Sequence, residues 1–78
     1  MSAFKEHDVI ALLVDIPAQG LRRGDVGTVV HVFDGTDAHP AGFIVEFVDE
    51  SGAVYAQADI TDQTQLMRLH FHFKREAA

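Results

Sequence analysis

The sequence predicts an all-β domain of five short strands, and three observations support this fold class. The apolar segments are short and rich in Val, Ile and Phe, which are residues that favour strands. Clusters of Gly, Asp and Pro separate these segments, as turns separate the strands of β proteins. No window of about 11 residues carries the i, i+3, i+4, i+7 apolar spacing of an amphipathic helix, which disfavours the main alternative, an open α+β sheet.

Two strands and two loops are predicted in the first half of the chain. The first strand covers residues 8–14, and a long loop covers residues 15–24. Helix- and strand-breaking residues interrupt that loop at Pro17, Gly20 and Gly24. The second strand covers residues 26–33, and a medium loop then runs from Asp34 to about Pro40.

The third predicted strand, residues 43–48, is amphipathic. Glu46 marks its solvent face, so the side chains of the other face should point into the core; these are Phe43, Val45 and Phe47. Residues 49–52 then predict a tight hairpin turn, in which Gly52 is available for a positive φ.

The last part of the chain predicts two more strands around a short helical turn. The fourth strand covers residues 53–58. Residues 59–65 have weak strand character, and three of their side chains can cap a single helical turn: Asp59, Thr61 and Asp62. The fifth strand begins at Leu66 and is expected to continue to Phe73.

This order of elements predicts a small five-stranded SH3-like barrel with a short helical turn before the last strand. Closing the sheet on itself protects the edges that an open five-stranded sheet would expose. We divide the chain into an N-terminal lead-in at 1–7, a barrel domain at 8–73 and a C-terminal tail at 74–78.

Three separated blocks of the chain resemble one known family. The blocks are Asp8-Val9-Ile10-Ala11-Leu12-Leu13, then Leu21-Arg22-Arg23-Gly24-Asp25-Val26-Gly27-Thr28-Val29-Val30, and then Val45-Glu46-Phe47-Val48-Asp49-Glu50-Ser51-Gly52. In order and spacing they are similar to the small bacterial proteins of the DUF4926 domain family, over about residues 8–69. That family has no settled biochemical role, so the resemblance implies a fold and not a function. The chain departs from the family pattern at 59–65, and residues 69–74 look like an extension.

The block from Gly24 to Val30 is also similar, more loosely, to the KOW motif of ribosomal and transcription-elongation proteins, which would imply RNA binding. A physical interpretation of the same block needs no RNA. Gly24 permits a turn, and Gly27 lacks a side chain where the strand bends and crowds its neighbour. The block therefore indicates a barrel first, and KOW-like nucleic-acid binding stays an alternative function.

Composition narrows the classes of function. The 78 residues suffice for one domain, there is no cysteine, and the formal charge is −6. A phosphate backbone repels such a charge, whereas a basic or neutral protein partner does not. Residues 1–8 lack the pattern of a signal peptide, and the apolar run at 9–14 is far below the roughly 20 residues of a membrane span. We expect a cytoplasmic protein with no membrane partner.

The five histidines raise the question of a metal site. His70 and His72 are two apart on one predicted strand and share a face, and His31 lies near them if the register of pairing allows. Zinc needs three or four ligands, so we expect neither a metal nor another cofactor. In the simpler interpretation, His70 and His72 lie on the polar face of an amphipathic strand. His7, near the terminus, and His39, in a loop, add little.

The carboxylates do not suggest an enzyme. Asp is common in turns because its side chain bonds the local backbone. The acids that fall in predicted turns are Asp34, Asp37, Asp49, Glu50, Asp59 and Asp62. The sequence has no Ser-His-Asp arrangement and no phosphate-binding glycine loop. We therefore predict that the domain is not catalytic.

Four residues before the tail are candidates for partner binding. Arg22 and Arg23 lie in the long loop, which borders the ligand groove in SH3-like barrels, and can meet an acidic partner or a phosphate. Alternatively, they are a solvated pair that offsets local acidity. Phe33 and Tyr55 are candidate groove aromatics for peptide recognition, although the tryptophan of true SH3 domains is absent.

The end of the last strand is the remaining candidate. An apolar strand that runs past a small barrel leaves Phe71 and Phe73 without an obvious surface to cover them. They can pair with a second chain or another protein, or they can fold back over the open end of the barrel. Our first functional hypothesis is thus a non-catalytic protein-interaction module. It would be an accessory or regulatory subunit that binds a protein partner, or forms a homodimer, through its loops and last strand. A small histidine-based metal-binding protein is a further alternative.

Overall fold

The computed structural model describes residues 4–70 of the chain. Within these residues, five antiparallel strands form a single sheet in the order β4-β3-β2-β1-β5. The strands are β1 (Val9–Leu12), β2 (Val26–Phe33), β3 (Gly42–Val48), β4 (Val54–Ile60) and β5 (Leu66–Arg68). Two short 3₁₀ turns, η1 (Pro17–Gln19) and η2 (Gln63–Gln65), precede β2 and β5. Within residues 4–70 no helix has the length and apolar character to cross a membrane.

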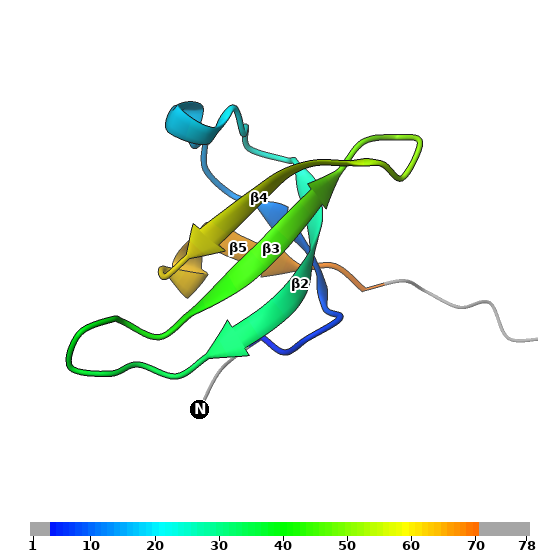
Figure 1. Ribbon diagram of the computed structural model, residues 1–78. Helices are drawn as coiled ribbons and strands as arrows, with labels where there is room; N and C mark the ends of the chain where they lie inside the picture. The colour runs from blue at the N-terminus through cyan, green and yellow to red at the C-terminus, as the bar shows by residue number, and fades with distance from the viewer. Residues whose placement is uncertain (1–3, 71–78) are drawn as a thin grey trace, which may run out of the picture.

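The sheet curls back on itself. In Figure 1, β2, β3 and β4 form one layer, and β1 and β5 lie behind it. A register shift between Val29 and His31 marks a bulge that bends β2. The first half of β2 pairs with both β1 and β3, whereas its second half pairs with β3 alone. The predicted all-β class is therefore confirmed, as a small barrel-like fold.

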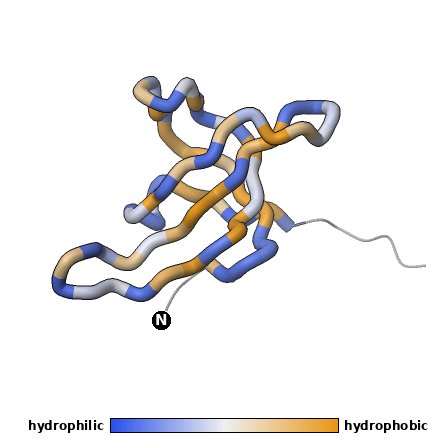
Figure 2. The backbone as a smooth tube through the Cα atoms, viewed as in Figure 1, coloured by the Kyte–Doolittle hydropathy of each residue, from blue (hydrophilic) through white to orange (hydrophobic). Residues whose placement is uncertain are grey.

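The core lies between the two layers. Figure 2 shows apolar residues along the strands and polar residues at the tips of the loops. Phe43, Val45 and Phe47 are all buried, as their alternation with Glu46 predicts. The other members of the core are Phe4, Ile10, Leu12, Leu21, Val29, Ala58, Ile60 and Leu66.

The lead-in contributes Phe4 to this core, although the predicted barrel domain starts at residue 8. The Phe4 ring meets the Phe43 ring edge-on, with 5.3 Å between the centroids. The Arg68 guanidinium lies 5.6 Å from the centre of the Phe4 ring, within the range of a cation–π contact. The same guanidinium pairs with Asp8, with 3.1 Å between Nη2 and Oδ2. The N-terminal segment thus packs against both β3 and β5 through these contacts.

Several strand boundaries differ from the predicted ones: β3 begins at Gly42 rather than at residue 43, and β4 begins at Val54 rather than at residue 53. β1 is shorter at both ends than the predicted strand at 8–14. β4 continues past the predicted end at residue 58, since Asp59 pairs with Ile44 and Ile60 pairs with Phe43. The prediction that Asp59 lies in a turn is therefore wrong. β5 ends at Arg68 and does not continue through residues 69 and 70.

The local turn signals behave as the sequence predicts. Gly24 and Gly52 adopt positive φ angles of 92° and 87°. η2 is the predicted helical turn, and Asp62 caps it by accepting a hydrogen bond from the Thr64 amide at 3.0 Å. Gly27 lies against β3, where a Cβ would come within 2.7 Å of a backbone oxygen. Local sequence therefore determines where the chain turns and where two strands approach closely.

Candidate functional site

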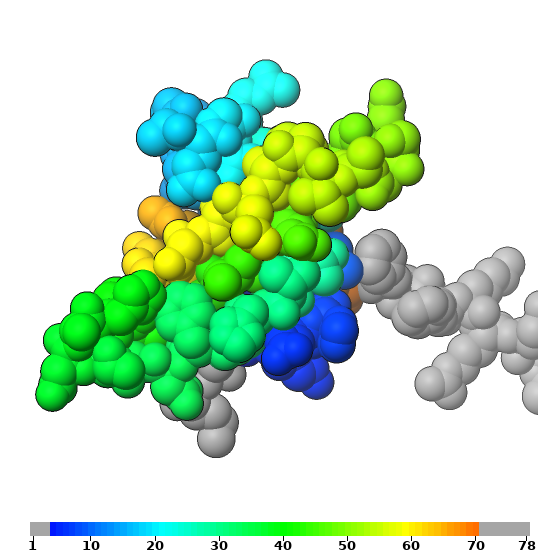
Figure 3. Space-filling model, in the orientation of Figure 1, coloured from blue at the N-terminus to red at the C-terminus, as the bar shows by residue number. Residues whose placement is uncertain are grey.

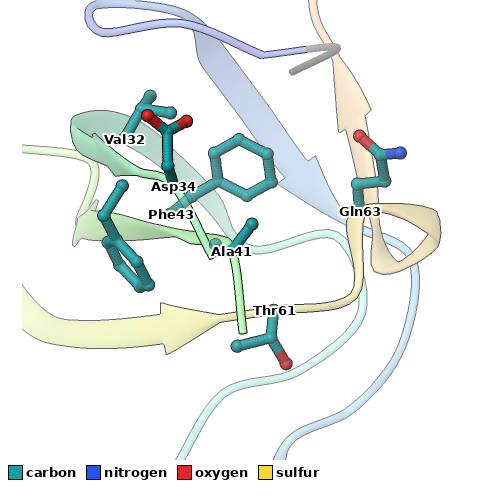
Figure 4. Close-up of a pocket in the computed structure, with 8 residues that line it drawn as sticks. Val32, Asp34, Ala41, Phe43, Thr61 and Gln63 are labelled. Atoms are coloured by element: carbon teal, nitrogen blue, oxygen red, sulfur yellow. The ribbon is translucent and has the colours of Figure 1, made fainter. Parts of the chain in front are cut away.

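A pocket of about 200 Å³ opens beside the end of β2. It lies between the β2–β3 loop and the segment that leads into η2, as the close-up in Figure 4 shows. Its apolar wall is formed by Val32, Phe33, Ala41 and Phe43. Its polar side chains are those of Asp34, Thr61 and Gln63. We name it the Phe33 pocket, after the predicted partner-binding residue that lines it.

Strand pairing brings separate segments of the chain to this pocket. Phe33 pairs with Gly42 at the end of the β2–β3 ladder. Phe43 pairs with Ile60 at the end of β4, so the chain enters the pocket wall directly after β4, at Thr61. A Cβ on Gly42 would lie 2.8 Å from the Ile60 carbonyl oxygen and 3.2 Å from the Phe33 ring. The glycine therefore permits the close approach that forms the pocket.

Two histidines extend the aromatic surface around Phe33. The His31 ring stacks on it, with 6.1 Å between centroids and 25° between planes. The His39 ring meets Phe33 edge-on at 4.9 Å, and its Nε2 lies 3.6 Å from Oδ2 of Asp59. Both members of that pair are 50% exposed, so as an ion pair it contributes only about 0–1 kcal/mol. Its structural effect is to join the β2–β3 loop to β4.

Thr36 sets the position of His39 within the loop. Its hydroxyl accepts hydrogen bonds from the amides of Ala38 at 3.2 Å and His39 at 3.0 Å. Its own amide donates to the His39 carbonyl oxygen at 2.7 Å. This is the local turn chemistry of a Thr hydroxyl, and it closes the tip of the β2–β3 loop.

Tyr55, the second predicted groove aromatic, lies toward the other end of the sheet. It follows Val54, which pairs with Val48, whereas Phe33 pairs with Gly42. Six residue steps along β3 separate those two pairing positions, which is roughly 20 Å at about 3.3 Å per residue. The two rings therefore do not line one groove.

Tyr55 lies instead beside the long loop that carries the two predicted arginines. Burial and a side-chain hydrogen bond to Asp25 raise the pKa of the Tyr55 hydroxyl, and the charge of Arg22 acts in the opposite direction. Arg22 and Arg23 are exposed. Their amides donate to the carboxylates of Asp25 at 2.9 Å and Asp15 at 2.8 Å. The structure thus brings Arg22 and Tyr55 together, away from Phe33.

The predicted metal candidates and tail residues fall partly beyond the described part of the chain. His31 and His70 are exposed, and Phe71, His72 and Phe73 lie outside the described residues. Within residues 4–70 no three His, Cys, Asp or Glu side chains gather in a way that could hold a metal ion.

Two of the predicted turn acids hold the backbone of their own turns. One oxygen of Asp49 accepts from the Ser51 hydroxyl at 2.6 Å and from the amides of Ser51 and Ala53 at 2.8 and 3.1 Å. These bonds, the one from the Ser51 hydroxyl above all, lower the pKa of Asp49. Bonds from the side chain and amide of Thr64 lower the pKa of Asp62 in the same way. Turn chemistry accounts for both carboxylates.

The sequence points to Phe33 as a partner-binding residue, but it does not point to the neighbours of Phe33 in the pocket. Ala41 and Gln63 belong to no motif, and Thr61 is only a candidate helix cap in the sequence. The pairing of β3 with β2 and β4 brings all three near Phe33. His39 was given no weight, although it contacts Phe33 directly. One signal was available, since a hairpin brings the residues that flank its loop together.

Comparison with known proteins identifies a family but no characterised relative. The model of a domain of unknown function, DUF4926, matches residues 6–67. No curated protein and no solved structure matches the chain. The matched segment contains all the side chains of the Phe33 pocket, and it confirms the resemblance carried by the three sequence blocks.

Proposed function

The chain belongs to the DUF4926 family, a domain of unknown function, and we propose a role from the chain's own geometry. The domain is a non-catalytic protein-interaction module, and its Phe33 pocket holds a side chain of the partner protein. One observation carries this proposal: the half-buried Phe33 ring borders a pocket that has an apolar wall and opens to solvent.

The size of the pocket favours a side chain over a small-molecule substrate. Pockets for small-molecule ligands span roughly 300–1,000 Å³, whereas this one has a volume of about 200 Å³. Protein interfaces obtain most of their binding free energy from a few anchoring side chains that fill pockets on the partner. A pocket of this volume suits one such anchor.

The surroundings of the pocket also support a protein partner. Aromatic residues are enriched at protein interfaces, and the rings of His31, Phe33 and His39 form a continuous aromatic surface beside the pocket. The formal charge of −6 disfavours a nucleic acid, because the phosphate backbone is itself negative. Asp49 and Asp62 accept hydrogen bonds from hydroxyls of their own turns, so these carboxylates have a structural role. This supports a function without catalysis.

Crosslinking in cells of the source organism, followed by quantitative mass spectrometry, tests this role. The tagged full chain is compared with Phe33→Ala and with Tyr55→Ala. The second variant is a matched control, since it also removes an aromatic ring from a strand but lies away from the pocket. We expect wild type and Tyr55→Ala to enrich the same proteins, and Phe33→Ala to lose them by about tenfold or more, as for an anchoring residue.

Circular dichroism establishes whether Phe33→Ala is folded. If it is not, Ala41→Phe replaces it, because this substitution fills the pocket from an exposed position. Enrichment of the same proteins by the pocket variant and the control, or enrichment of none above the tag alone, would refute the proposed role.

A further inference from the structure

The Phe33 pocket lies in a part of the chain that has no lysine or arginine. Residues 24–67 contain neither, and they contain eight acidic residues: Asp25, Asp34, Asp37, Glu46, Asp49, Glu50, Asp59 and Asp62. This segment comprises β2, β3, β4 and η2 with their loops. Four of the eight belong to the segments around the pocket, since Asp34 lines it, Asp37 lies in the same loop, and Asp59 and Asp62 flank Thr61 in the chain.

None of the four lysine and arginine side chains of residues 4–70 lines the pocket. Arg68 pairs with Asp8, on the β5–β1 side of the sheet. Arg22 and Arg23 precede β2, while Phe33 ends it. The seven steps of β2 separate the two ends by roughly 23 Å at about 3.3 Å per residue. Lys5 belongs to the N-terminal lead-in and follows Phe4, whose ring meets Phe43 of the pocket wall. The segments that form the pocket therefore carry four carboxylates and no lysine or arginine of their own.

We propose that the Phe33 pocket takes an arginine or lysine side chain from a basic segment of the partner protein. This inference rests on the proposed function and specifies the chemistry of the partner. The methylene stem of such a side chain covers the apolar wall formed by Val32, Ala41 and Phe43, while its charged end reaches the carboxylate of Asp34. In Figure 4 the Asp34 carboxylate and the Gln63 side chain stand on opposite sides of the Phe43 ring.

Arginine suits the pocket better than lysine does. Its planar guanidinium presents five N–H donors in a fixed fork. It also donates two hydrogen bonds at once to a carboxylate, whereas a lysine ammonium acts as a point charge. The amide oxygen of Gln63 and the hydroxyl of Thr61 are further acceptors in the pocket wall.

A neutral apolar side chain suits the pocket less well. It would cover the apolar wall, but it would also displace water from Asp34 without offering a hydrogen bond in exchange. A carboxylate that loses water and gains no partner costs free energy. A cationic side chain compensates for that loss, and the negative field of residues 24–67 also accelerates its approach.

The β2–β3 loop is open to such a partner. Figure 3 shows this loop, in green, projecting from the body of the domain. Asp34 and Asp37 are both exposed within it. A basic segment can therefore reach both carboxylates without any rearrangement of the sheet.

The test is an NMR titration of the full chain with two short peptides. One peptide carries arginine at every third position of a glycine–serine background. The other carries citrulline at the same positions, which preserves the shape of the side chain and removes its charge. We expect the arginine peptide to shift the amides of residues 32–34, 41–43 and 61–63. We also expect it to bind about fivefold more tightly than the citrulline peptide, as for a partly exposed ion pair.

Two variants distinguish binding in the pocket from nonspecific electrostatic attraction between the basic peptide and the acidic domain. Asp34→Asn should weaken binding of the arginine peptide about fivefold, because it removes the negative charge and one of the two acceptor oxygens at this position. Glu50→Gln is the matched control, since it removes the same charge from an exposed position in the β3–β4 hairpin, and it should change binding less than about twofold in physiological salt. Equal effects of the two variants would overturn the proposal.

Three other results would also overturn it: equal binding of the two peptides, no binding, or shifts confined to residues outside the pocket. Shifts of the pocket amides that grow with protein concentration in the absence of peptide would assign the pocket to a second copy of the chain. If partner capture in cells depends on Phe33 while the arginine peptide does not reach the pocket, the interaction module stands and the basic partner is wrong. If capture is also independent of Phe33, both proposals are wrong.

Discussion

Gly27 lies in the part of β2 that pairs on both sides, with Ile10 of β1 and Phe47 of β3. A Cβ at this position would lie 2.7 Å from the carbonyl oxygen of Glu46, 2.7 Å from Cγ1 of Val45 and 3.0 Å from Cδ1 of Phe47. The oxygen belongs to the sheet backbone and cannot rotate away as a side chain can. The substitution Gly27→Ala therefore forces β2 and β3 apart where they meet in the core.

The size of the effect follows from two opposing contributions. Forcing an extra carbon into a dense core costs about 1–3 kcal/mol, and we take the upper value because one contact is with backbone. Alanine also reduces the freedom of the unfolded chain, which offsets about 0.4–1 kcal/mol. We expect a net loss of about 2–2.6 kcal/mol in the free energy of unfolding. This is large for a chain of 78 residues whose total stability should be about 4–12 kcal/mol.

The matched control is Gly24→Ala. No atom lies within 4 Å of a Cβ at this position, but the φ of 92° is unfavourable for alanine. The backbone cost of about 1–2 kcal/mol is again partly offset in the unfolded chain, so the net loss should be about 1 kcal/mol. The two variants therefore separate steric overlap from backbone strain.

Urea unfolding followed by circular dichroism measures both variants, and the m-value should not change. In thermal melts, Gly27→Ala should lower Tm by roughly 10–20 °C. If Gly27→Ala loses no more free energy than Gly24→Ala, or stays within about 0.5 kcal/mol of wild type, the close contact at Gly27 does not limit the packing of the barrel.

Three further outcomes follow from contacts elsewhere in the domain. Phe4→Ala should lower the free energy of unfolding by about 3 kcal/mol, the lower end of the range for a buried phenylalanine, and urea unfolding measures the loss. Asp49 and Asp62 have folded-state pKa values below 3.8, because their ionised forms accept hydrogen bonds from neighbouring hydroxyls. The stabilisation that these two carboxylates contribute is therefore complete above their unfolded-state pKa, which is the higher value. It is lost as the pH falls through their lower folded-state pKa values. Unfolding curves recorded from about pH 6 to about pH 2 should show this loss of stability. Asp8→Asn breaks the 3.1 Å pair with Arg68. A double-mutant cycle that combines it with Arg68→Gln should give a coupling energy of about 1 kcal/mol between the two side chains.

Each of these outcomes has a contrary result. A loss below about 1 kcal/mol for Phe4→Ala would show that the lead-in is not part of the core. An unchanged acid limb in the double variant Asp49→Asn/Asp62→Asn would show that these turns do not respond to ionisation. A coupling energy near zero would show that the pair of Asp8 with Arg68 does not stabilise the fold.

The local sequence pattern is sufficient to predict which strand residues face the core and where the chain turns. The alternation in β3 predicted that Phe43 and Phe47 are buried, because the face on which a strand residue lies depends only on its spacing from its neighbours. Asp62 was a candidate cap because a cap needs only a side-chain oxygen two residues before the amide it accepts from. The position of Gly27 was also predicted, since a glycine within a strand commonly marks a close approach of backbone.

The location of the candidate site, in contrast, depends on strand pairing between distant segments of the chain. Phe33 and Tyr55 are both candidate groove aromatics by sequence, but the sequence does not show that they lie toward opposite ends of the sheet. The sequence predicts a turn at Asp59 because Asp side chains favour turns, and pairing with Ile44 overrides that preference. The buried position of Phe4 likewise depends on a contact with β3, which lies far along the chain.

The sequence by itself determined the all-β class, the turns and the acidic character of residues 24–67, because each depends on residues that are near one another in the chain. Only the tertiary structure decided that a pocket exists. Phe33, Ala41 and Thr61 line it together because β3 pairs with β2 on one side and with β4 on the other. A slip of one residue in either pairing would turn the side chains of a strand to the opposite face. That register follows from how the whole sheet packs around its core, and no local pattern specifies it.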